Sequence, residues 1–507
     1  MEKIKKRYES AKLLYLCLMA VYVAVREVSP LHIYIGSRYV SAGIFLCGFA
    51  LIVAGLFLSD GCFSDRRSDA LSLFLAVTAL SCAVNFKYGY ADNIKALGAM
   101  VLFFFLFFEC GAKKTKERRK TEINCITGTL SAVWAFFTIA SFLMFSLSIY
   151  YQVKDGGWVA TSQGFSPVYN RLWGVFQDPN YAGYVSDVVI FAGIRFFLHT
   201  KKAVVKAINV LHILLQIGFL TLAGSFSATL LLLAAMFVFA FYAFGSRRVE
   251  KRSGAYVKSA VAAALCGALC YGLIVGGQYV LPYVRVLNGL LPESVPFAVT
   301  EIYNTVYSHS DLEIINVKTA YGKDGTGEEA GTEPIKRKDT AASKGEDDVS
   351  HGRFDRWVQT LQIFSGTPVV GTSPRDLSSY AKEHFPNTLM AKYRMAPHNG
   401  YLDILAGTGV LGAAAFLLFF LPALIALLKK YFRFENDTDF LFSVVAVFIM
   451  AASALFVSDL FFMISVGAFV FWTFMGYALH TEEATSEKKG LLRKLYEAVF
   501  RRKGRAA

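Results

Sequence analysis

A histidine and an asparagine stand side by side at His398 and Asn399, where a long polar segment meets an apolar run. An imidazole titrates near neutral pH, so a histidine at the rigid start of a helix on a membrane surface can accept a proton from a substrate hydroxyl. Asp403 follows Asn399 by one helical turn and is placed to orient it. The alternative is a hydrogen-bonded structural histidine, followed by glycines that serve close helix packing. These glycines are Gly407, Gly409 and Gly412.

Two arginines offer sites for an oxyanion. Arg171 precedes an Asp-Pro-Asn turn, and Arg353 opens an amphipathic stretch, 353–364. A guanidinium can bind phosphate through two parallel hydrogen bonds, which a lysine cannot reproduce. The competing interpretations are a snorkelling interfacial side chain at Arg171 and a solvated helix face at Arg353.

Asn180 and Asp187 form a third candidate group. Asn180 closes the Asp-Pro-Asn turn and can cap the helix that follows. Asp187 lies on the same helical face, about two turns into an apolar run. An ionisable side chain is costly at that depth, so Asp187 is either functional or a helix–helix hydrogen-bond partner.

The elements that position these residues are membrane-spanning helices. Of 507 residues, 55% are hydrophobic and only 18% are charged, against about 25% charged in a soluble protein. The apolar residues form uninterrupted blocks, and a block of roughly 18 residues or more predicts a spanning helix. We therefore expect an all-α polytopic membrane protein with about 12 spans. The blocks are 11–25, 39–58, 70–84, 96–108, 126–150, 181–198, 207–223, 226–244, 259–281, 402–428, 440–457 and 461–479.

The net charge of +14 reflects topology. Basic clusters fall on one side when the spans are threaded alternately, which is the positive-inside pattern, so both termini are expected in the cytoplasm. This placement predicts contact with anionic membrane lipids and argues against nucleic-acid binding. The clusters are 3–12, 113–120, 195–206, 247–258, 429–433 and 488–505.

Two outer segments are too long to be turns. The shorter, 151–180, interrupts spans 1–9 in residues 1–281, and the longer, 282–397, forms a module between spans 9 and 10. Its middle, 318–350, has almost no large apolar residue and is expected to be disordered, whereas 295–306 and 353–364 are expected to be ordered. Residues 398–479 hold the last spans, and 480–507 form a basic cytoplasmic tail. We find no motif for a metal or a cofactor.

The order of these motifs resembles that of a known family. An Arg-x-x-Gly-x-x-x-x-Pro-Asn string runs from Arg171 to Asn180, and a long loop carries Gly352-Arg353 and Gly371-Thr372. His-Asn-x-x-Leu then begins at His398, with a Gly-x-x-Gly ending. This combination, over residues 171–428, resembles the O-antigen ligase and polymerase superfamily of bacterial membrane glycosyltransferases.

The resemblance implies a metal-independent transfer that needs no cofactor. The donor would be an oligosaccharide linked to a polyprenyl diphosphate, passed en bloc to a hydroxyl of a glycan or lipid outside the bacterial cytoplasmic membrane. Arg171 and Arg353 would hold the diphosphate and His398 would act on the acceptor, with Asn180, Asn399 and Asp187 as further substrate contacts. One departure is the absence of a Ser-Arg pair, since residues 224–227 read Gly-Ser-Phe-Ser.

We therefore expect a cell-surface polysaccharide polymerase or ligase, and favour a polymerase. A flippase or a chain-length protein is a partner that this reaction allows. The alternative function is a transporter or flippase of lipid-linked glycans, which would place charged residues along a path through the membrane. Asp187 is the main deep charge, and the other candidates gather at one face, which favours an enzyme over that alternative and over a structural scaffold.

Overall fold

The computed structural model describes most of the chain. The described residues are 2–58, 66–112, 114–147, 149–155, 158–166, 170–246, 255–283, 313–318 and 352–480, together with Lys494. The predicted order at 295–306 lies outside these residues, as does the predicted disorder at 318–350 except for Lys318. Most of the predicted tail lies outside them too.

The predicted all-α membrane class is confirmed. Among the described residues, 10 helices are long and apolar enough to cross a membrane. The last two predicted spans coincide with shorter apolar helices, Thr438–Ser453 and Val466–Leu479. The count of twelve spans therefore stays a prediction.

By its internal contacts the chain divides into two units. The first comprises Met1–Met19, Ala42–Ile126 and Asp348–Ala507, and the second comprises Ala20–Ser41 and Thr127–Asp347. Helices α1 (Glu2–Arg26), α3 (Arg38–Leu58) and α6 (Lys116–Ser146) contribute residues to both. The other helices of the first unit are α4 (Arg66–Val84), α5 (Tyr90–Leu102), α12 (Arg353–Phe364), α13 (Leu377–His384), α14 (Leu389–Tyr393), α15 (Gly400–Tyr431), α16 (Thr438–Ser453) and α17 (Val466–Leu479).

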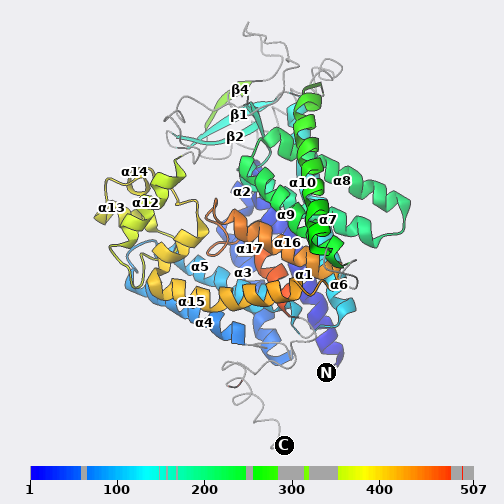
Figure 1. The fold of residues 1–507 in the computed structure, drawn as a ribbon. Coiled ribbons are helices and arrows are strands. Elements are labelled where there is room, and N and C mark those ends of the chain that lie inside the picture. Colours follow the sequence, from blue (N-terminus) through cyan, green and yellow to red (C-terminus); the bar gives the residue numbers. More distant parts are fainter. Residues whose placement is uncertain are drawn as a thin grey trace, which may run out of the picture. The chain divides into compact units, whose positions relative to one another are not determined.

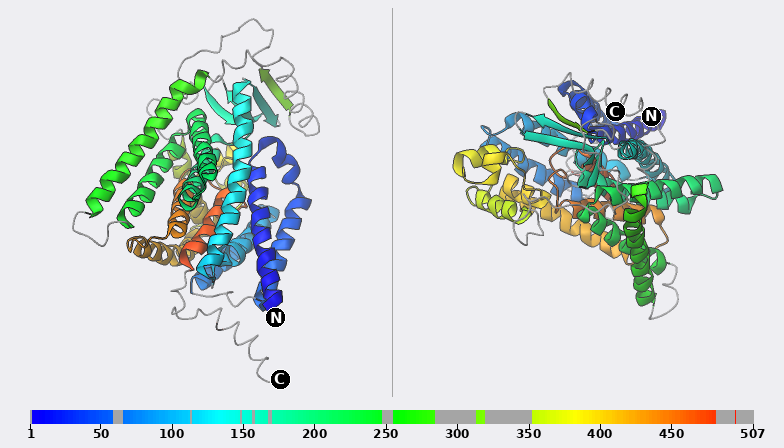
Figure 2. Two further views of the ribbon diagram at one scale, coloured as in Figure 1. Left: turned by 90° about the vertical axis from the view of Figure 1, so that its right-hand side faces the viewer. Right: turned by 90° about the horizontal axis from the view of Figure 1, so that it is seen from above.

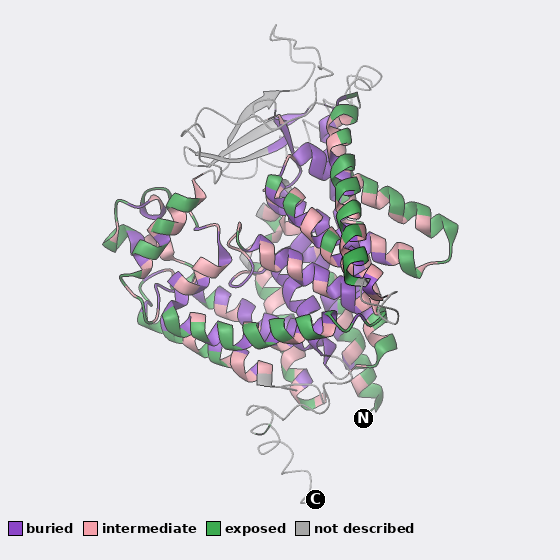
Figure 3. Ribbon diagram, in the orientation of Figure 1, coloured by how far each residue is buried: buried purple, intermediate pink, exposed green. Residues whose placement is uncertain are grey.

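The core of the first unit surrounds α17, which is buried along its whole length (Figure 3). Trp472 is fully buried, with its ring centroid 4.9 Å from that of Phe104 and 5.7 Å from that of Phe419. A Cβ added at Gly476 would lie 2.1 Å from the carbonyl oxygen of Phe108, so only glycine allows this close backbone contact. With 14 residues, α17 is only about 21 Å long. Other parts of the protein cover the apolar surface of α17.

Three short helices of the long outer segment form a small cluster in the same unit. Figure 1 shows α12, α13 and α14 grouped together, in yellow. Their buried residues include Ile363, Tyr380 and Met390, which pack with Tyr88 from the turn between α4 and α5. The helix predicted at 353–364 is confirmed; its Phe354 and Leu361 are exposed, and its Ile363 is buried.

The second unit contains α2 (Ser29–Ile35) and four long helices. These are α7 (Pro179–His199), α8 (Ala203–Ala223), α9 (Phe226–Ser246) and α10 (Ala255–Val280). Figure 2 shows them in green, with α10 beside α9. Trp134 of α6 stacks on Phe176 with ring centroids 4.6 Å apart and donates a hydrogen bond from its indole nitrogen to Ser186 of α7 (3.1 Å). These contacts fix the start of α7 against α6.

A small antiparallel sheet accompanies these helices, which the sequence analysis did not predict. Strands β1 (Tyr150–Asp155), β2 (Trp158–Ser166) and β3 (Arg171–Gly174) come from the shorter outer segment, and β4 (Glu313–Lys318) from the longer one. Their order is β3-β2-β1-β4 (Figure 1). The signal was present, because Asp155 and Gly156 lie between two runs rich in aromatic and β-branched residues, as in a hairpin.

Candidate active site

The His398–Asn399 corner is a helix start with a constrained backbone. Asn399 caps α15, and its Oδ1 accepts hydrogen bonds from the backbone N–H groups of Tyr401 (3.0 Å) and Leu402 (3.2 Å). His398 has a φ of 53°, in the left-handed region that non-glycine residues seldom adopt. Such a conformation persists only where surrounding contacts impose it, and it is common at functional sites. The direction in which the half-buried imidazole leaves the chain is therefore set by the backbone.

Residues 454–465, between α16 and α17, contact the His398–Asn399 helix start. The backbone N–H of Gly400 donates to the carbonyl oxygen of Ala454 (2.7 Å), and that of Asn399 donates to Ser458 Oγ (3.2 Å). The Tyr401 and Phe461 rings lie 5.6 Å apart. We call residues 454–465 the α16–α17 connection. The predicted spans left only 458–460 between them, so the sequence analysis missed most of this element.

Arg353 reaches the same connection from the start of α12. Its guanidinium lies 5.3 Å from the centre of the Phe456 ring, a cation–π contact. One helical turn later, Arg356 is half-buried, and its Nε has no hydrogen-bond partner among the described residues. Burial, followed by the positive charge of Arg353, lowers the pKa of Arg356. Two guanidinium groups thus share a region of positive potential.

Asp403 and Arg375 also meet the α16–α17 connection. Ser458 hydrogen bonds to the buried carboxyl group of Asp403, and the charges of Arg375 and Asp459 act on that group. Arg375 Nη1 lies 3.4 Å from Met463 Sδ. Arg375, Ser458 and Asp459 were not predicted from the sequence, because proximity to the helix start is visible only in the fold.

The α15 helix is interrupted at Gly409, and a loop packs against the interruption. Gly409 has φ 67° and ψ −170°, and a Cβ there would lie 2.2 Å from the carbonyl oxygen of Val369. The N–H groups of Thr372 and Ser373 donate to Ala406 and Gly407 carbonyl oxygens (2.8 and 3.0 Å). Two of the glycines expected to serve helix packing, Gly407 and Gly409, therefore admit the loop that contains residues 368–373, whereas a Cβ at Gly412 would meet Thr408. The loop satisfies backbone groups at the break, as apolar surroundings require.

Arg171 and Asn180 meet in the second unit. Arg171 Nε donates to the carbonyl oxygen of Ala223 (2.9 Å), and Nη2 donates to Asn180 Oδ1 (3.1 Å). Asp178, rather than Asn180, caps α7, since its Oδ1 accepts from the N–H of Asn180 (2.7 Å). Both of these acceptors of Arg171 are neutral, and Ala223 borders the turn at 224–227 where the Ser-Arg pair was missing.

Asp187 lies within the helices of the second unit. Its side chain is fully buried, and neither carboxyl oxygen has a hydrogen-bond partner among the described residues. It lies near Cys270 of α10. The structure thus brings Arg353 and Asn399, the neighbour of His398, onto one connection in the first unit and pairs Arg171 with Asn180 in the second.

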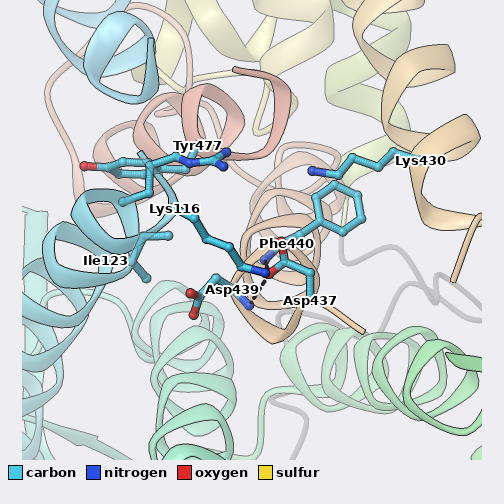
Figure 4. Close-up of a pocket in the computed structure, with 8 residues that line it drawn as sticks. Lys116, Ile123, Lys430, Asp437, Asp439, Phe440 and Tyr477 are labelled. Carbon is cyan, nitrogen blue, oxygen red and sulfur yellow. Dashed lines mark hydrogen bonds between the residues drawn. The ribbon is translucent and has the colours of Figure 1, made fainter. Parts of the chain in front are cut away.

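A pocket lies at the other ends of α15 and α16, away from the α16–α17 connection. Lys116, Arg119 and Lys430 line it with Asp437 and Asp439 (Figure 4). Asp437 caps α16, and Lys430 Nζ lies 4.0 Å from the centre of the Phe440 ring. This end carries two of the basic clusters that predicted a cytoplasmic face. It holds one arginine rather than a pair, and its carboxylate Asp437 is engaged in capping α16, so it is the weaker candidate site.

Comparison with known families supports the candidate site at Arg353, His398 and Asn399. Residues 211–417 match the family described as O-Antigen ligase. This segment includes Arg353, His398 and Asn399, whereas Arg171, Asn180 and Asp187 precede it. A comparison with curated proteins found no match.

The predicted recognition of the O-antigen ligase superfamily is confirmed. The match to this superfamily, together with the apolar helices, indicates a multi-pass membrane enzyme that ligates or polymerises glycans.

Among the described residues, no group of three or more histidine, cysteine or acidic side chains lies close enough to hold a metal ion.

Proposed function

We propose that the protein transfers a polyprenyl-diphosphate-linked glycan to an acceptor hydroxyl at the outer face of the bacterial cytoplasmic membrane. The observation that carries this proposal is the convergence of Arg353, His398-Asn399 and Asp403 on the α16–α17 connection. A cation, a titratable imidazole and a buried carboxyl group at one helix start suit displacement of a charged leaving group by a hydroxyl.

The reaction exchanges one anomeric bond for another. The acceptor oxygen forms a bond to the anomeric carbon as the bond from that carbon to the diphosphate oxygen breaks, and the diphosphate departs with the electron pair. Arg353 stabilises the negative charge that develops on the diphosphate. His398 accepts the acceptor proton, and attack in line with the departing group inverts the anomeric configuration.

Asn399 and Asp403 position these groups. Asn399 fixes the start of α15 and therefore the backbone of His398. Arg171 and Asn180 are proposed as a further diphosphate contact, because they share one motif and Arg171 Nη2 donates to Asn180 Oδ1 (3.1 Å). Asp187 is fully buried, and it stays a proposed substrate-binding residue.

Analysis of lipid-linked intermediates tests the function. Cells lacking the protein should accumulate carrier-linked single repeat units if it is a polymerase, which we favour, or full-length carrier-linked polymer if it is a ligase. Restoring the gene should clear the intermediate, whereas His398→Ala should not. Normal surface glycan without any accumulated carrier-linked intermediate would contradict the proposal.

A further inference from the structure

Arg375 stands on an unusually well-fixed loop of the first unit. Its backbone N–H donates to Asn93 Oδ1 (3.0 Å), and the Asn93 amide donates to Ser373 Oγ (3.0 Å) and to the Tyr88 carbonyl oxygen (2.8 Å). Asn93 itself is buried in α5. The backbone of Arg375 is therefore held by a spanning helix, although the Arg375 side chain is exposed.

The same loop is locked to α15. Gly371 has a φ of 72°, and a Cβ there would lie 2.5 Å from the backbone nitrogen of Thr408. Asn85 donates to the Gly371 carbonyl oxygen (2.8 Å), and Ser81 donates to that of Gly407 (2.7 Å). These contacts, with those of residues 372 and 373, fix the loop relative to the helix that begins at Asn399.

The surroundings of the Arg375 side chain leave it able to bind an anion. Its close contact is a neutral thioether, Met463 Sδ, on the α16–α17 connection. No carboxylate among the described residues forms an ion pair with it, and the nearby Asp403 is half-buried, with its carboxyl group bonded to Ser458. An exposed guanidinium without such a pair loses little on binding an oxyanion and gains charge-assisted hydrogen bonds.

We propose that Arg375 is a second oxyanion-binding residue of this site, beside Arg353. Both arginines contact the α16–α17 connection, Arg353 at Phe456 and Arg375 at Met463. The inference rests on the proposed function and adds to it a residue that binds the charged part of the donor. That oxyanion is either the carrier diphosphate or an acidic group on the glycan.

Binding by the purified full-length protein in lipid nanodiscs separates these sources. The first probe is undecaprenyl diphosphate without sugar, and the second is the natural glycan-bearing donor. Arg375→Gln should weaken binding by about tenfold or more, with Arg375→Lys intermediate because it keeps charge but loses the two-pronged geometry. Arg394→Gln, at an exposed arginine following α14, should bind like the wild-type protein.

The outcomes are distinct. Weaker binding of both probes by Arg375→Gln supports the inference and assigns the diphosphate. Weaker binding of only the glycan-bearing donor supports it and assigns an acidic sugar. Unchanged binding of both probes, with loss of binding in Arg353→Gln, overturns the inference and keeps the proposed function. A wild-type protein that binds neither probe refutes the proposed function itself. Thermal unfolding of each variant near the wild-type midpoint excludes misfolding.

Discussion

Ser458→Ala should remove the side chain that joins Asn399 and Asp403 to the α16–α17 connection. The Ser458 hydroxyl accepts the hydrogen bond of the Asn399 backbone N–H (3.2 Å) and hydrogen bonds to the buried Asp403 carboxyl group. Its removal leaves a backbone donor and a buried carboxyl oxygen without their partners. The other oxygen of Asp403 already lacks a partner among the described residues, so no second bond compensates.

The expected magnitude follows from those two bonds. An unsatisfied buried group costs about 1–3 kcal/mol, so losing both partners should lower the free energy of unfolding by about 2–6 kcal/mol. Glycan transfer should fall as well, since displacement of a reacting group by about 1 Å can cost on the order of 10²-fold in rate. His398 directly precedes the freed N–H of Asn399 in the chain.

A denaturing-detergent titration of the purified protein measures the stability change, and in vitro transfer measures the rate. Ser453→Ala is the matched control, because Ser453 is also buried but its hydroxyl bonds only the Met450 carbonyl oxygen within its own helix (2.9 Å). Its effect should stay below about 1 kcal/mol. Equal effects of the two substitutions, or none at Ser458, would refute the argued role of the connection.

Three further predictions concern the long outer segment. Arg353→Lys should impair transfer strongly in a steady-state assay, because lysine loses the two-pronged contact, and Arg356→Lys should be milder; equal losses would undo the assignment. Replacing 318–350 with a short Gly/Ser linker should preserve product formation, since that stretch has almost no large apolar residue. The hydrogen bond from Lys87 (2.7 Å), followed by that from Tyr88, lowers the pKa of Glu383. A lowered pKa means that Glu383 stabilises the contact of α13 with Tyr88 at neutral pH and loses this effect as the pH falls below the usual glutamate range. Hydrogen exchange in α13 should then rise in acid, and Glu383→Gln should remove the dependence.

The membrane class was predictable from the sequence because uninterrupted apolar blocks of spanning length are typical of helices that cross a bilayer. The helix start at Asn399 and the helix at Arg353 were predictable too, since local signals are strong at both places. The sheet was missed, because the Asp155-Gly156 hairpin signal lay inside a segment interpreted as a loop. Interactions between residues distant in sequence, such as Arg375 with Met463, leave no local pattern.

The α16–α17 connection shows why boundaries were harder to predict than helices. Phe461, Phe462 and Ile464 are apolar and were assigned to a span, yet they lie before the start of α17. They are buried against the unit's core without being helical. Ser465, which caps α17 through the N–H of Ala468 (2.9 Å), was the one local signal of the true start.

The pairing of Arg171 with Asn180 was only partly foreseeable. Their common motif suggested a shared role, but the contact of Arg171 with the Ala223 carbonyl oxygen depends on how α8 ends at Gly224, where φ is 57°. Asp187 was correctly placed two turns into a helix, but its complete burial could not be derived from spacing alone. Periodicity gives the face of a helix, whereas burial depends on which helix covers that face.

The rate of glycan transfer by purified His398→Gln tests the central claim most directly. Glutamine keeps hydrogen bonding and cannot accept a proton at neutral pH, so the rate should fall by about 10²-fold or more while donor binding stays unchanged. His398→Ala should abolish transfer with normal protein abundance. Transfer near the wild-type rate in His398→Gln would contradict the account, because the acceptor proton would then leave by another group.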